Sequence, residues 1–492
     1  MSELKEIIRE KLKTRKNYDE VRESLVRDGY LEEEFEKELD EIIKEDEVEK
    51  KKELKSNSKK IVSIDGISKF GSGLLSNQYL NVILYLISSS NLFLVGVVTT
   101  IRYVISLFSS FYTEKKLQYM NPSKVKLSLI GFGIAITSTV FGYALMSMNL
   151  YLFIAAFILL GYLLNIFNKI YLHISKELVK NEKRGFAFRR LAFFTLIFSL
   201  VGLFMGSVVL DFIGIGHSNN LIAALSNNYL VLILFLLYSV SYYIIAFIIL
   251  SFKGLKGMQF YEKKSIITEL KNSISDIKIF FSDRLLSLLF VAGFLTLFVA
   301  TIGNSFYGIF IFNQLNVFGN LRFLRIAIIF AVTIVASMIG PYIVKINSRG
   351  LGKIIMLVFG TFLSSFMPFF LSISPIIKSG YNSNYLNLII ISFAALLNFI
   401  GVSIVGSAFG MVVVDLIPTE HRAKFFNSNQ IALILPSIIF MPIASYIAQQ
   451  FGLRVLFMSL AVITAFIITP MYMLIIFINE SKKKKRLRKL FY

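Results

Sequence analysis

Residues 76–86 read SNQYLNVILYL and lie within the first long apolar stretch of the chain. Two Asn and one Gln stand here where a membrane-spanning segment would be expected to carry aliphatic residues. In the second half of the chain, residues 303–313 read GNSFYGIFIFN, so a small residue, an Asn, an aromatic residue and an apolar run recur in the same order. This recurrence indicates an internal repeat, and it raises the question of what amides do in an apolar segment.

Composition places the chain among integral membrane proteins. The 492 residues are 55% hydrophobic, and the mean hydropathy of +0.67 is too high for a soluble domain. The sequence has no Cys and 3 His, which excludes a disulfide framework and disfavours a Cys/His metal site. We therefore expect no metal, no cofactor and no catalytic residue.

Twelve apolar segments follow one another along the chain, most of them near the roughly 20 residues that cross a bilayer as a helix. They are continuously apolar and do not alternate, which favours helices over a β-barrel. The segments fall near residues 67–88, 92–112, 126–147, 150–173, 190–210, 228–251, 284–313, 321–345, 353–374, 386–411, 428–449 and 455–478.

Basic residues collect on one side of these segments. They fill the loops after the second, fourth, sixth, eighth and tenth segments and the tail KKKKRLRK, whereas the opposite loops are almost free of them. Because basic loops stay in the cytoplasm, we expect a multi-pass protein of the cell membrane with both termini cytoplasmic. The net charge of +21 then reflects topology and attraction to membrane lipids, and we expect no nucleic-acid partner.

The N-terminal region differs sharply from the rest. It is dense in charges of both signs, with apolar residues such as Val21, Leu25 and Leu31 at helical spacing, and it lacks the apolar core of a signal peptide. Residues 18–43, with LVRDGYLEEEF at their centre, resemble short UBA-like helical modules found in some archaeal proteins. The alternative is a solvated charged helix pair and linker that binds no partner.

These features predict five regions. They are a charged cytoplasmic helical extension (1–65), a first six-helix bundle (66–252), a cytoplasmic central loop (253–281), a second six-helix bundle (282–480) and a basic cytoplasmic tail (481–492).

Loop sequences support the duplication of six segments. EKRGFAF at residues 182–188 follows the fourth segment, and EHRAKFF at residues 420–426 follows the tenth. From residue 67 to about residue 479 the chain resembles the major facilitator superfamily of secondary transporters, most specifically in DLIPTEHRAKFFNSNQ at residues 415–430. The family's Gly-x-x-x-Asp-x-x-Gly-Arg-Arg loop is eroded, since only Gly340, Lys345 and the basic SRGLGK remain of its second copy. The resemblance implies an all-α fold with twelve transmembrane helices in two pseudo-symmetric bundles, and a substrate path between the bundles.

The amides and one arginine are the candidate binding residues. Polar groups in a membrane-spanning helix are costly unless they face protein or a water-filled cavity, and Asn77 and Asn81 share a helix face with Gln78 beside it. Asn304 and Tyr307 are their counterparts in the repeat, and in the resembling family the first and seventh spans line the central cavity. The alternative is that the amides only join helices.

Arg102 lies near the middle of the second segment, with no acidic residue nearby in the sequence. We expect it either to bind an anionic group of a substrate or to be satisfied by neighbouring helices. Arg322 and Arg325 start the eighth segment and are expected to extend toward the membrane surface. The predicted substrate-binding set is Asn77, Gln78, Asn81, Arg102, Asn304 and Tyr307.

Function follows from these residues and from the resemblance. We expect a monomeric secondary transporter that moves a small polar or anionic organic solute by alternating access, and not an enzyme. No carboxylate lies at mid-membrane between residues 66 and 479, which disfavours simple carboxylate-mediated proton symport. Two alternatives remain: an exporter resembling lipid-linked oligosaccharide flippases, and a transport-inactive membrane scaffold or sensor that uses the extension.

Overall fold

The computed structural model describes most of the chain, and all its regular elements are helices. The described residues are 18–28, 32–119, 124–178, 184–213, 229–252, 284–315, 317–319, 321–347, 352–377, 382–416 and 438–478, with isolated positions at 5, 7, 8, 10, 11, 281 and 435. The central loop, the basic tail and most of the loop at residues 415–430 lie outside these ranges.

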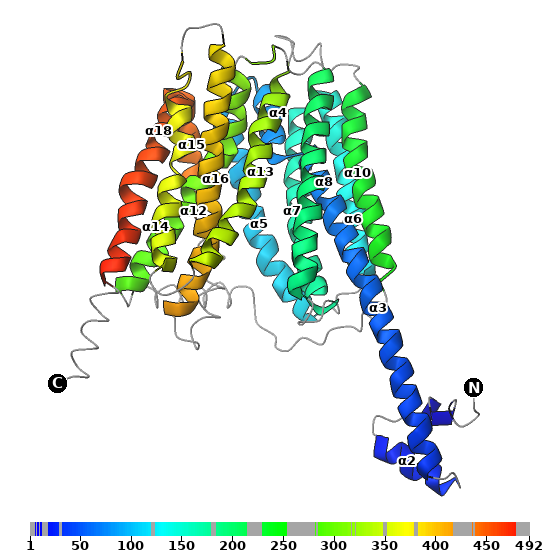
Figure 1. Ribbon diagram of the computed structural model, residues 1–492. Coiled ribbons are helices and arrows are strands. Elements are labelled where there is room, and N and C mark those ends of the chain that lie inside the picture. The colour runs from blue at the N-terminus through cyan, green and yellow to red at the C-terminus, as the bar shows by residue number, and fades with distance from the viewer. Residues whose placement is uncertain are drawn as a thin grey trace, which may run out of the picture.

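The helices run up and down the bundle in chain order (Figure 1). In the first half they are α2 (Tyr18–Arg27), α3 (Glu32–Leu74), α4 (Asn77–Ile87), α5 (Leu92–Tyr119), α6 (Lys124–Met146), α7 (Leu150–Leu178), α8 (Arg184–Phe212) and α10 (Tyr229–Leu250). In the second half they are α12 (Arg284–Gln314), α13 (Arg322–Ile346), α14 (Gly352–Leu363), α15 (Phe366–Ser372), α16 (Ser383–Leu416), a helix at Ile438–Phe451 and α18 (Leu453–Val462), which continues through a π-helical turn at Ile463–Ile468.

Within the described residues, nine helices are long and apolar enough to cross a membrane. Two shorter apolar helical stretches, Leu92–Ser106 within α5 and the helix Ile438–Phe451, overlap the second and eleventh predicted segments. The chain is therefore a multi-pass membrane protein, and the long seventh segment is one helix of 31 residues.

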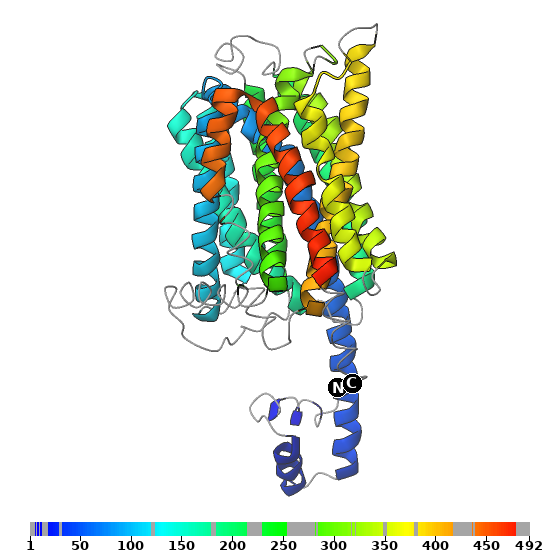
Figure 2. The ribbon, with the colours of Figure 1, turned by 90° about the vertical axis from the view of Figure 1, so that its left-hand side faces the viewer.

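α3 crosses the boundary placed at residue 65. It is a single helix of 43 residues, and its first half projects from one end of the bundle (Figures 1 and 2). Near its start, Ile42 packs with Ile8, Val21 and Leu25 in a small cluster separate from the core of the bundle. The extension and the first membrane segment thus share one helix and are not joined through a flexible linker.

The first apolar segment is interrupted where the quoted stretch begins. α3 ends at Leu74, and Ser76 is the N-cap of α4, with φ −61° and ψ 147°. The Ser76 hydroxyl accepts a hydrogen bond from the backbone N–H of Tyr79 at 3.3 Å, as an N-cap serine does. This break places the first turn of α4, with Asn77 and Gln78, inside the bundle.

Candidate functional site

A cavity of about 820 Å³ opens among the helices of the first half. It follows α3 from Leu75 down to Ile64, toward the end of the bundle from which α3 projects. The other walls come from α4, α5, α7 and α10, while α12 of the second half contributes Asn304 and Ser305. The volume accommodates an organic solute together with water.

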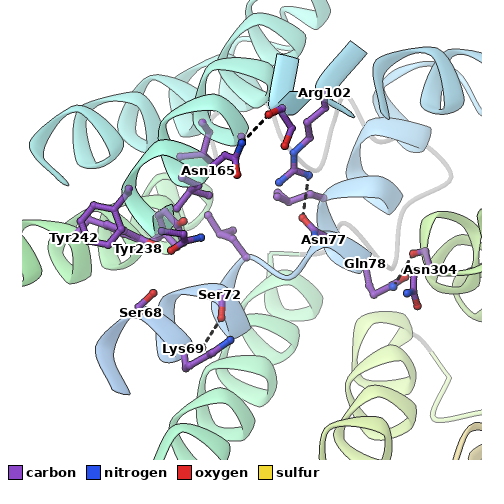
Figure 3. Close-up of a pocket in the computed structure, with 18 of the residues that line it drawn as sticks. Ser68, Lys69, Ser72, Asn77, Gln78, Arg102, Asn165, Tyr238, Tyr242 and Asn304 are labelled. Atoms are coloured by element: carbon purple, nitrogen blue, oxygen red, sulfur yellow. Dashed lines mark hydrogen bonds between the residues drawn. The ribbon is translucent and has the colours of Figure 1, made fainter. Parts of the chain in front are cut away.

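Arg102 reaches into this cavity from α5 (Figure 3). Its Nη1 donates to the Asn77 side-chain oxygen at 3.0 Å, and its guanidinium carbon lies 4.6 Å from the centre of the Phe157 ring. The partners described for Arg102 are a neutral amide and the face of an aromatic ring. Its positive charge is therefore held in place without being neutralised by them.

Gly161 of α7 makes room for this arginine. A Cβ atom built on Gly161 would lie 2.6 Å from the Arg102 Nε, closer than real Cβ contacts come. The absence of a side chain at this position allows the arginine to lie flat against α7.

Gln78 and Asn81 have a different task, because they bind the backbone of α12. Gln78 Nε2 donates to the Asn304 carbonyl at 2.7 Å, and the Gly308 N–H donates to Gln78 Oε1 at 3.0 Å. Asn81 Nδ2 donates to the Ser305 carbonyl at 3.1 Å. Both amides line the cavity and also join the two halves. Facing a cavity and joining helices are therefore not exclusive roles at these two positions.

Five of the six predicted residues line the cavity: Asn77, Gln78, Asn81, Arg102 and Asn304. Tyr307 does not. It is 3% exposed, its ring lies 5.3 Å from that of Phe457, and it lines a second cavity of about 20 Å³ within the second half. Asn304 lines both cavities, and Tyr307, one turn further along α12, lines the second cavity only.

Four tyrosines of the cavity wall were not predicted from the sequence: Tyr103, Tyr171, Tyr238 and Tyr242. Tyr242 is hydrogen-bonded to Ser68 and to Tyr238, and the rings of Tyr238 and Tyr242 lie 5.1 Å apart. The sequence SVSYY at residues 239–243 marks this stretch by its polar groups, but it does not say which face of α10 points inward.

Asp65 and Lys69 also line the cavity, one turn apart on α3. Asp65 is hydrogen-bonded to the Tyr171 phenol. The prediction that mid-membrane carboxylates are absent covered residues 66–479, so it made no statement about Asp65. Among the described residues, the charged side chains that line the cavity are thus Asp65, Lys69 and Arg102.

The weaker candidates divide between the two cavities. Asn165 and Asn168 line the large one, and Asn165 Nδ2 donates to the Ser106 carbonyl at 2.9 Å. Asn398 lines the small one. Within the described part of the chain no cluster of three or more His, Cys, Asp or Glu could hold a metal ion.

Arg325 corrects a prediction. It is 1% exposed and does not extend to the membrane surface. Its guanidinium donates to the backbone carbonyls of Leu315, Val317 and Gly319, which the turn between α12 and α13 presents to it. The cost of burying the charge is offset by these dipoles.

No family model matches the sequence, and no curated protein matches it. Solved structures do match in fold. The nucleoside transporter NupG superposes with a TM-score of 0.60 at 10% identity, over 85% of this chain and 99% of that one. A POT family transporter in complex with 5-aminolevulinic acid gives 0.57 at 14%, over 85% and 95%.

A variant of the E. coli fucose:proton symporter FucP gives a TM-score of 0.52 at 12% identity, over 86% of this chain and 99% of that one. The likeness spans nearly the whole of each neighbour. It supports a membrane-transporter fold, and at these identities it concerns the fold alone.

Proposed function

We propose that this protein is a secondary transporter that moves a small polar or anionic organic solute across the cell membrane by alternating access. The supporting observation is Arg102, a cation held at the cavity wall by a neutral amide and an aromatic ring. An anionic group that enters the cavity supplies the charge that the described contacts lack. The amides and tyrosines provide hydrogen-bonding groups for the rest of the solute.

The proposal includes the architecture predicted from the sequence. Twelve transmembrane helices form two six-helix bundles, both termini lie in the cytoplasm, and the protein acts as a monomer. α3 and α4 together form the first membrane crossing. In this orientation the cavity is open to the cytoplasm, because it extends toward the end from which α3 projects. The UBA-like character of the extension belongs to the same proposal.

A thermal-shift panel on the purified protein tests the function. A solute that binds only the folded state raises the apparent melting temperature by mass action. The panel contains gluconate, glucose and glucosamine as a set that carries an anionic, a neutral and a cationic group, together with amino acids, nucleosides and organic acids. We expect stabilisation by anions that exceeds the effect of their neutral analogues.

Arg102→Gln is the decisive variant. It should weaken binding of the stabilising anion at least tenfold, about 1.4 kcal/mol. Arg454→Gln is the matched control, because Arg454 is exposed on α18 and contacts Gln314 outside the cavity. If Arg102→Gln lowers the melting temperature but leaves the affinity unchanged, the arginine is structural and the proposal of an anionic substrate fails.

A further inference from the structure

The two halves contact each other at the end of the bundle opposite the one from which α3 projects (Figure 1). α8 ends there, α13 and α5 begin there, and the helix Ile438–Phe451 ends there. The first four N–H groups of a helix have no partner within it. A helix that starts at a buried junction therefore needs acceptors from elsewhere.

α13 obtains its acceptors from the other half of the molecule. Its own N-cap residue is Leu321, which offers no side-chain cap. Asp211, at the end of α8, accepts from the Phe323 N–H at 2.9 Å and from the Leu324 N–H at 2.8 Å. Asp211 is 1% exposed, and a buried charge needs stabilising partners. These are the two N–H groups, the dipole of α13 and the nearby Arg325.

α5 has a local cap, because the Asn91 side chain accepts from the Leu94 N–H at 2.9 Å, but its first N–H is bonded by the other half. Gln449, near the end of the helix Ile438–Phe451, accepts from the Leu92 N–H at 2.7 Å. The two helices approach closely one turn further along, since a Cβ atom on Gly96 would overlap the Ser445 side chain. In the proposed repeat the second and eighth segments correspond, and so do the fifth and eleventh, so the two contacts join corresponding pairs of helices: Asp211 accepts from two N–H groups of α13 and Gln449 from one of α5.

We propose that Asp211 and Gln449 form a reciprocal latch that holds this end of the transporter closed and so determines which end of the cavity is open. Each residue belongs to one half and satisfies a helix start in the other, so separating the halves at this end must break both caps. The inference rests on the proposed transport function for its purpose. What it states about the protein itself is that the two contacts shift the equilibrium between the closed and open forms of this end.

The physical effect of losing a cap is specific to one conformation. With the end closed, Asp211→Ala leaves one buried and one part-buried N–H group without their acceptor, which is costly. With the end open, water reaches the start of α13 and supplies acceptors. The substitution therefore disfavours the closed form and favours the open one.

Spin-label distances measure this equilibrium without any solute. The chain has no Cys, so labels can be placed at or next to the two ends of the same pair of helices, α6 and the helix Leu453–Ile478 that begins with α18. Ser147 and Val455 report on the closed end, and Val125 and Phe477 on the other end; all four are exposed. Asp211→Ala should raise the ratio of open to closed populations about tenfold, lengthening the first distance and shortening the second. Asp211→Asn, which keeps one acceptor oxygen, should give a smaller shift.

Asn387→Ala is the matched control. Asn387 is also 1% exposed and also accepts from two successive backbone N–H groups, those of Ile376 and Ile377, but all three residues belong to the second half. It should lower the melting temperature without moving either distance. If Asp211→Ala behaves like Asn387→Ala, the cap is only structural and the latch proposal is overturned.

Gln449 provides an independent arm in case Asp211→Ala does not fold. Gln449→Ala should shift the distances toward the open form, and Gln449→Glu, which places a negative charge at the start of α5, should shift them a few-fold the other way. Unchanged distances in both variants contradict the latch. Because these measurements need no solute, shifted distances together with an Arg102→Gln variant of normal affinity would retain the latch and reject the substrate site.

Discussion

The first half of the bundle contains a cavity of about 820 Å³, whereas the second half contains one of about 20 Å³. The large cavity is lined by Arg102, tyrosines and amides. The small one is bounded by apolar side chains such as Val299 and Phe399 and by uncharged polar ones such as Thr296 and Asn398, and it has room for about one water molecule. The two cavities thus differ in size and in the charge of their lining, and we expect solute selectivity to depend on the first half.

The largest expected effect comes from filling the space behind Arg102. Gly161→Leu keeps the charge of Arg102 but displaces its side chain from Asn77, because the new Cβ would overlap the Arg102 Nε. Binding of the anion identified in the thermal-shift panel should weaken at least tenfold, about 1.4 kcal/mol, as measured by isothermal titration calorimetry.

The control for this change lies in the second half. A Cβ atom built on Gly406 of α16 would have no other atom within 4 Å, so Gly406→Leu should leave the affinity unchanged. Equal losses from both substitutions would mean that the large cavity does not determine binding.

A matched pair of tyrosines gives the next effect. Tyr238 lines the large cavity and Tyr307 the small one. Removal of a hydroxyl that bonds the solute, directly or through its neighbours, costs about 0.5–1.5 kcal/mol. Tyr238→Phe should therefore weaken binding about two- to tenfold, whereas Tyr307→Phe should change it less than twofold. The reverse order would move the site to the second half.

The sequence predicted the apolar segments and much of the cavity, for identifiable reasons. Asn77 and Asn81 are four residues apart, so the sequence shows that they share a helix face. A polar residue within a membrane segment usually faces the protein interior or a water-filled cavity. Tyr307 was assigned through the repeat, which matches positions along the chain but not the direction in which each side chain points.

Other features depend on packing that a single sequence does not show. The packing of α7 and α10 against α3 determines which faces of these helices point inward. It therefore determines that Tyr171, Tyr238 and Tyr242 line the cavity. The start of α4 had a local signal, since Ser76 before Asn77 is a typical N-cap. The apolar residues on both sides of Ser76 nevertheless made the stretch look like one continuous helix, so the break between α3 and α4 was not predicted. The cap from Asp211 to α13 joins residues more than 100 positions apart, and nothing local at Leu321 points to it.

A smaller effect is expected from filling the second cavity. Val402→Ile adds one methylene group beside a void of about 20 Å³. Burying a methylene group contributes up to about 0.8 kcal/mol, so the melting temperature should rise slightly and the solute affinity should stay the same. A loss of affinity would show that solute or water must enter the second half during binding.

The smallest effect is expected from removing the extension. Its own apolar cluster, with Ile8, Val21, Leu25 and Ile42, is separate from the core of the bundle, while α3 joins that core from Ile61 onward. Deletion of residues 1–55 leaves Ser56 to cap the shortened α3 and removes none of the cavity wall. The truncated protein should insert into the membrane, elute as one species in detergent and bind the solute with unchanged affinity. Because α3 is continuous, it would carry any movement of the first half to the extension, so a loss of solute binding on deletion would show that the extension helps to set the conformation of the cavity. That result would favour the alternative of a membrane sensor over a carrier with a dispensable N-terminal module.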